Sequence, residues 1–120
     1  MTTEVKTQFT ETLNTQEAYL SSLKRQKEVY KNSILFANYV ITVNDLMTVG
    51  VKREKGKKWL DNKYGVLPTL YTKEDAKQNK KALEDNDNQN VKVVNKTIWY
   101  KKEIERVETF IQSLQRIINN

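Results

Sequence analysis

The sequence predicts an all-α fold: one domain over residues 1–120, with long helices in a bundle or hairpin arrangement. Apolar residues recur at three- and four-residue steps over two long stretches, which is helical periodicity. The chain holds only three Gly and one Pro, few of the residues that turns between many strands require. With 38% hydrophobic and 30% charged residues the core is thin, so we expect the chain to self-associate.

The first helical stretch is expected from about residue 3 to residue 49, as one long helix or two. Gly50 is a natural residue for it to end on. Gln16 and Lys27 lie on the apolar face of this stretch, and the β-branched run 41–43 is its weakest part for a helix. The apolar residues of that face are Phe9, Leu13, Leu20, Leu23, Tyr30, Ile34, Ala37 and Ile41.

Two shorter helices are expected in the middle of the chain. Residues 59–64 are interpreted as the last part of one helix, which closes at Gly65. Thr72 is a typical N-cap residue, and Asp75 stands in the position of the capping-box acid. A helix is therefore predicted to begin after Thr72 and to run to about Leu83.

The last helix is predicted from about residue 91 to residue 118, after a polar linker at residues 84–90. Its apolar stripe follows the 3-4-3-4 spacing of a coiled coil. Such a stripe fits an intramolecular seam against the first stretch or an intersubunit seam, and we take it as the oligomerisation surface. Its residues are Ile104, Val107, Ile111, Leu114 and Ile118.

The charge of the chain is concentrated in its middle. The net charge is +6. Residues 1–50 and residues 82–120 each carry as many acids as bases, whereas residues 51–81 hold ten Lys/Arg and four acids, 10 − 4 = +6. A local positive field of this kind attracts nucleic acid, an anionic membrane or an acidic protein. The plainer interpretation is a solvated surface whose lysines provide solubility.

The candidate binding residues lie in the first part of this basic segment. Cations that follow the phosphates, together with exposed rings that stack on bases, are what single-stranded nucleic-acid binding needs. The aromatic residues Trp59 and Tyr64 would supply the rings, unless they belong to the core. The candidate cations are Lys52, Arg53, Lys55, Lys57, Lys58 and Lys63.

The residue types argue against an enzyme and against a bound metal or cofactor. The chain has no His and no Cys, which removes the commonest general base, thiolate nucleophiles and the usual zinc ligands. Residues 50–58 resemble a phosphate-binding loop, but five residues separate its glycines and Lys58 stands where Ser or Thr is needed. Residues 85–96 begin like a calcium loop, but Asn90 and Lys96 replace its essential Gly and Glu.

The chain is expected to be cytoplasmic. Its first residues contain no apolar stretch of the kind found in secretory signals. Its longest apolar run, residues 34–43, is interrupted by Asn38 and is much shorter than the roughly 20 residues of a membrane span.

The order of features is similar to that of a known family. The segment 57–65 (KKWLDNKYG) closes a basic stretch with a Leu-Asp pair, a tyrosine and a glycine. Tyr71, the acidic turn 83–87 (LEDND) and the aromatic pair Trp99-Tyr100 follow in order. In these features the chain resembles the phage T4-type recombination mediator family, UvsY.

The resemblance implies a ring-like oligomer joined through C-terminal helices. It also implies single-stranded DNA binding through Lys57 and its basic neighbours, and contacts with a RecA-like recombinase and a single-strand-binding protein. The hypothesis is a non-enzymatic mediator that helps load the recombinase in place of the single-strand-binding protein. The alternatives are a structural or scaffold-like helical assembly protein and a small protein-binding inhibitor or immunity protein.

Overall fold

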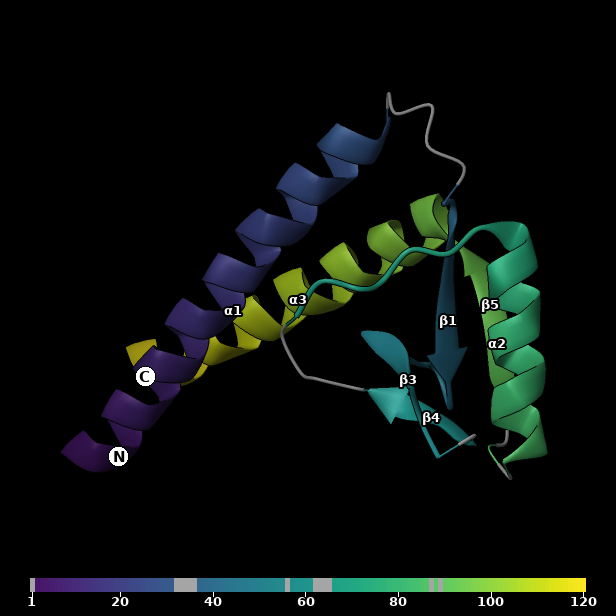
Figure 1. Ribbon diagram of the computed structural model, residues 1–120. Helices are drawn as coiled ribbons and strands as arrows, with labels where there is room; N and C mark the ends of the chain where they lie inside the picture. Colours follow the sequence, from purple (N-terminus) through teal and green to yellow (C-terminus); the bar gives the residue numbers. More distant parts are fainter. Residues whose placement is uncertain (1, 32–36, 56, 62–65, 87, 89) are drawn as a thin grey trace.

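A computed structural model of the chain (Figure 1) describes residues 2–31, 37–55, 57–61, 66–86, 88 and 90–120. The described residues form three helices and five strands, so the prediction of an all-α fold is wrong and the fold is mixed α/β. The elements are α1 (Thr3–Lys31), β1 (Tyr39–Val43), β2 (Leu46–Met47), β3 (Gly50–Glu54), β4 (Lys57–Asp61), α2 (Lys73–Asp85), β5 (Val91–Asn95) and α3 (Lys96–Asn119).

The centre of the fold is an antiparallel sheet in the order β2-β1-β5. Strand β1 pairs with β5 along its whole length, from Tyr39 opposite Asn95 to Val43 opposite Val91. The first helical stretch therefore ends at Lys31 and not near residue 49, and the last helix begins at Lys96 and not at residue 91. The reason is that both strands consist mainly of β-branched residues, which pack well on a pleated surface.

Helices α1 and α3 pack side by side as a long antiparallel pair, with both chain termini at the same end (Figure 1). Their facing sides bury Tyr19 and Leu23 of α1 against a set of apolar residues from α3, together with Val40 of β1. Gln16, predicted to lie on the apolar face, is 1% exposed. The buried residues that α3 contributes are Trp99, Tyr100, Ile104, Val107 and Ile111.

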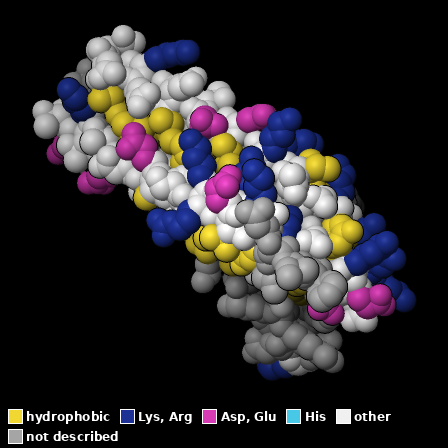
Figure 2. Space-filling view, turned by 90° about the horizontal axis from the view of Figure 1, so that it is seen from above, with side chains coloured by type: hydrophobic (Ala, Val, Ile, Leu, Met, Phe, Trp, Pro, Cys, Tyr) yellow, Lys and Arg dark blue, Asp and Glu magenta, His cyan; other side chains and the backbone are white. Residues whose placement is uncertain are grey.

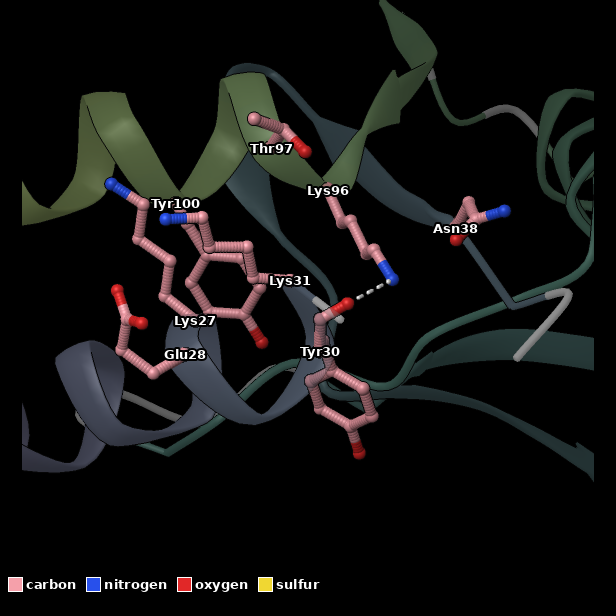
Figure 3. A pocket seen from close by; sticks show the side chains of 8 residues that line it. All are labelled: Lys27, Glu28, Tyr30, Lys31, Asn38, Lys96, Thr97 and Tyr100. Atoms are coloured by element: carbon pink, nitrogen blue, oxygen red, sulfur yellow. Dashed lines mark hydrogen bonds between the residues drawn. The ribbon is translucent and has the colours of Figure 1, made fainter. Parts of the chain in front are cut away.

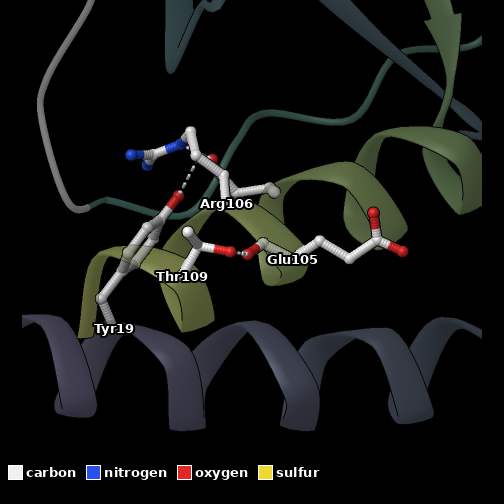
Figure 4. Close-up of polar contacts among 5 residues, drawn as sticks. Tyr19, Glu105, Arg106 and Thr109 are labelled. Atoms are coloured by element: carbon white, nitrogen blue, oxygen red, sulfur yellow. Dashed lines mark hydrogen bonds and ion pairs between the residues drawn. The ribbon is translucent and has the colours of Figure 1, made fainter. Parts of the chain in front are cut away.

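Polar contacts fix how the two helices sit against each other. The Tyr19 hydroxyl of α1 donates a hydrogen bond to Glu103 of α3 (2.8 Å), and Arg106 is paired with the same carboxylate. Figure 4 shows the Tyr19 side chain reaching across from α1 to α3. Lys24 of α1 also lies 3.8 Å from Glu108 of α3. This exposed ion pair adds little stability, so the apolar seam between the helices supplies most of it.

The remaining helix, α2, covers the opposite face of the sheet. Successive residues of a strand point to opposite faces. Accordingly, Val40 joins the core with α1 and α3, whereas Ile41 and Val43 pack with Leu83 of α2 and Val91 of β5. The sheet thus lies between the antiparallel pair α1 and α3 on one face and α2 on the other. None of the helices in the described ranges is long and apolar enough to cross a membrane.

The start of α2 was predicted from its N-cap, and this prediction is confirmed. The Thr72 side chain accepts a hydrogen bond from the Asp75 backbone N–H at 3.1 Å. Replacing Thr72 with Ala should lower the free energy of unfolding by about 1 kcal/mol, because that N–H then lacks a partner. Urea unfolding followed by circular dichroism would measure this, with Thr72→Ser as a control that keeps the hydroxyl. Equal losses for the two variants would contradict a capping role.

Candidate nucleic-acid interface

The basic segment begins with a β-hairpin, where the sequence had suggested a helix for residues 59–64. Strands β3 and β4 pair antiparallel from Gly50 opposite Asp61 to Glu54 opposite Lys57. Lys55, in the connection between them, has a positive φ of 51°, the backbone conformation that tight hairpin turns require. Because the strands are joined so tightly, the backbone of the basic residues in β3 lies beside that of the basic residues in β4.

The backbone register sets one pair of cations opposite each other. Arg53 pairs with Lys58, and on the next rungs Lys52 pairs with Trp59 and Glu54 with Lys57. Like charges directly opposite each other destabilise a strand pair. The register therefore contains one like-charge pair, Arg53 and Lys58, beside one pair of opposite charge, Glu54 and Lys57.

The structure describes the eight predicted binding residues to different extents. Lys55 is exposed. The backbone is described for Lys52, Arg53, Lys57, Lys58 and Trp59, which the hairpin brings together. Lys63 and Tyr64 lie outside the described residues. That all eight residues contact nucleic acid remains a prediction.

Helix α2 brings further lysines beside the hairpin, since α2 lies against β4. Lys73, Lys77 and Lys81 are exposed and four residues apart, so they share one face of the helix. Figure 2 shows Lys and Arg side chains gathered most densely in the half of the molecule that holds α2. These three residues were counted in the basic segment, but only the tertiary contact between α2 and β4 makes them candidate site residues.

The hairpin is tied to the rest of the fold through Tyr71. The Tyr71 backbone exchanges two hydrogen bonds with Tyr39 of β1, at 3.1 and 2.8 Å. Burial raises the pKa of the Tyr71 hydroxyl above its usual value, against the opposite effect of its hydrogen bonds to the Val51 backbone and the Thr48 side chain. Tyr71 therefore anchors the hairpin and is half-buried, which makes it a poor surface for stacking on a base.

The predicted oligomerisation stripe lies mostly inside the monomer. Ile104, Val107 and Ile111 face α1, and with Leu114 they are 9% exposed or less. Ile118 is partly exposed. Of the two alternatives that the sequence left open, the fold uses this stripe as an intramolecular seam. Whether the chain also associates through its exposed residues remains a prediction.

Metal binding finds no support among the side chains that are described. Across those residues, no group of three or more His, Cys, Asp or Glu comes together in a way that could hold an ion.

The fold and the charged surface define a small mixed α/β protein in which a basic hairpin is attached to a three-stranded sheet. The chain belongs to the family described as Domain of unknown function (DUF1978), whose model matches residues 50–120. This match spans β3 to α3 and leaves out α1, β1 and β2, which complete the core and the sheet. No curated protein matches the chain, and neither does any solved structure.

The resemblance to the UvsY family is wrong, because the family match points elsewhere and the structure differs from what the resemblance implied. The similarity rested on the order of basic, aromatic and acidic residues along the chain. Its central segment was interpreted as the end of a helix, whereas Lys57–Asp61 is strand β4. An order of residue types is compatible with either structure, because it does not record which segments pair.

Proposed function

We propose that this chain is a non-enzymatic binding protein whose β3–β4 hairpin and α2 hold single-stranded nucleic acid. The observation that carries the proposal is the register of the hairpin. It places Arg53 opposite Lys58, within a segment that holds the whole +6 net charge of the chain. The exposed lysines of α2 extend this cationic surface beyond the hairpin.

The preference for single strands rests on the pairing of Lys52 with Trp59 in the same hairpin. Single-strand binders combine cations that follow the backbone with aromatic rings on which bases stack, each stacked base contributing about 1–3 kcal/mol. A duplex keeps its bases stacked on each other and offers the hairpin only its phosphates. Binding without chemistry agrees with a chain that lacks His and Cys.

The finer role, helping to load a RecA-like recombinase in place of a single-strand-binding protein, followed from the UvsY resemblance alone, and so did both partner proteins and a ring-like oligomer. A cytoplasmic location belongs to the same proposal. A scaffold-like assembly protein and a small inhibitor whose cations meet an acidic partner are the alternatives.

Titration of a fluorescently labelled single-stranded oligonucleotide, followed by anisotropy at several salt concentrations, tests the proposal. On single strands the logarithm of the affinity falls by about 0.7 per logarithmic unit of salt for each phosphate neutralised. If four cations of the hairpin each meet a phosphate, the slope should be roughly −3. Unlabelled duplex should compete less well than unlabelled single strand. No binding at low salt would exclude this function and favour an acidic protein as the partner.

A further inference from the structure

A pocket of about 380 Å³ lies between the last turns of α1 and the first turn of α3. Its volume is within the range of about 300–1,000 Å³ that is usual for small-molecule sites. Figure 3 shows side chains from both helices and from the start of β1 around one hollow. The lining residues are Lys27, Glu28, Tyr30, Lys31, Asn38, Lys96, Thr97 and Tyr100.

Three lysines and one acid give this pocket a positive charge. Lys27 and Lys31 are four residues apart on α1, so they share a face, and Lys96 is the first residue of α3. Among the described residues no carboxylate forms an ion pair with any of the three. Because like charges on one helix face repel each other, an anion between them would stabilise this end of the molecule.

Lys96 is the least usual of the three lysines, since it is 8% exposed. Its ammonium donates a hydrogen bond to the Tyr30 carbonyl at 3.2 Å, the contact drawn in Figure 3, and lies 5.3 Å from the centroid of the Tyr30 ring. Lysine is rarely buried so far without a paired acid, because removing its charge from water is costly. One carbonyl and one ring face compensate part of that cost, and an anion in the pocket would compensate more.

The rest of the lining suits a ligand larger than a bare anion. Tyr30 offers a partly exposed ring, and Glu28, Asn38 and Thr97 offer polar groups that can meet hydroxyls or the edge of a base. Tyr100 forms an inner wall, where its hydroxyl donates to Gln26 and burial raises its pKa well above the usual range. A cationic end, an aromatic ring and a few polar groups are what a nucleoside phosphate requires.

We propose that this pocket binds a nucleoside phosphate, with the phosphate at Lys27 and Lys31 and the nucleoside beside Tyr30. Figure 3 shows the Lys27 and Lys31 ammonium groups on one side of the pocket, and Lys96 adds positive charge from the other side. The site is separate from the basic hairpin: the pocket adjoins the start of β1, where the Lys96 backbone N–H donates to Asn38, whereas the hairpin follows the other end of that strand (Figure 1). The inference therefore does not depend on nucleic-acid binding by the hairpin. The same chemistry is present in a free nucleotide and in the 5′-phosphorylated end of a strand.

Isothermal titration calorimetry of the full chain with thymidine 5′-monophosphate tests this proposal. The double variant Lys27→Gln and Lys31→Gln should weaken binding by about tenfold or more, because two charge-assisted contacts to the phosphate are lost. The matched control is Lys101→Gln with Lys102→Gln, which removes two exposed lysines from α3 outside the pocket and should leave the affinity unchanged. Thymidine without phosphate and inorganic phosphate alone should both bind more weakly than the nucleotide.

Several results would overturn the proposal. These are no heat of binding at millimolar nucleotide, equal affinities in the two double variants, or equal affinities for nucleotide and inorganic phosphate. The variant Lys57→Glu with Lys58→Glu should keep its nucleotide affinity, which separates failure at this pocket from failure at the hairpin. If the natural source is a strand end, an oligonucleotide with a 5′-phosphate should bind more tightly than one with a 5′-hydroxyl, and Lys27→Gln with Lys31→Gln should remove that difference. Equal binding of the two oligonucleotides would assign the pocket to free nucleotides.

Discussion

Changing Lys57 and Lys58 together to Glu is expected to weaken single-stranded DNA binding by at least about 30-fold. Both residues lie on β4, and Lys58 stands opposite Arg53 in the hairpin. Each substitution removes a cation from a phosphate and adds a charge that repels it. The slope of the logarithm of affinity against the logarithm of salt concentration should also become less negative by about 1.4, since each lost phosphate contact removes about 0.7. Anisotropy titrations at several salt concentrations measure both quantities.

The control for this experiment is the double variant Lys101→Glu and Lys102→Glu. It makes the same change in net charge at two adjacent, exposed lysines of α3, outside the basic segment. Its affinity should fall much less than that of the hairpin variant. If both variants lose affinity equally, only the total charge of the protein matters and the hairpin is not a site. Circular dichroism of both variants would show that each keeps its fold.

Replacing Ile111 with Asp is expected to lower the free energy of unfolding by at least about 3 kcal/mol. Ile111 is 8% exposed in the seam between α1 and α3, where it belongs to the main core. The substitution removes an apolar side chain and places a carboxylate in a cluster of apolar core residues. For a domain of this size such a loss is a large part of the total stability. Urea unfolding followed by circular dichroism measures it.

Ile117→Asp provides the matched control, because Ile117 lies on the same helix and is 39% exposed. Its effect on the free energy of unfolding should be within about 0.5 kcal/mol. Light scattering of both variants addresses self-association at the same time. If Ile111→Asp keeps wild-type stability but lowers the mass of the particle, Ile111 lies between subunits and the intramolecular seam described above is incorrect.

The helical parts of the fold could be predicted from the sequence because helical periodicity is local. Buried Gln16, Leu23 and the C-terminal stripe lie on the faces that their spacing indicates. The Thr72 N-cap was also predictable, since a cap bonds to a residue three positions away. In each case the interaction that decides the structure lies within a few residues of the pattern that predicts it.

The strands were missed for the opposite reason. Residues Tyr39–Val43 are a short apolar run, and Val91–Asn95 is a short run of three valines with a lysine and an asparagine. Periodicity alone cannot assign segments this short to helix or strand. Each satisfies its backbone hydrogen bonds through the other, from Tyr39 opposite Asn95 to Val43 opposite Val91. Their β-branched residues were a signal, and the run at Ile41–Val43 had already marked the weakest part of the predicted first helix.

For the candidate sites too, some features follow from the sequence alone and others only from the fold. The sequence by itself determined that the whole positive excess lies in residues 51–81, because charge can be counted without a structure. Only the tertiary structure decided that Arg53 pairs with Lys58 in the backbone register of a hairpin and that Lys27, Lys31 and Lys96 line one pocket. Strand register and helix packing join residues that are distant in the chain. Those contacts depend on which surfaces can be buried together, and a local pattern does not contain that information.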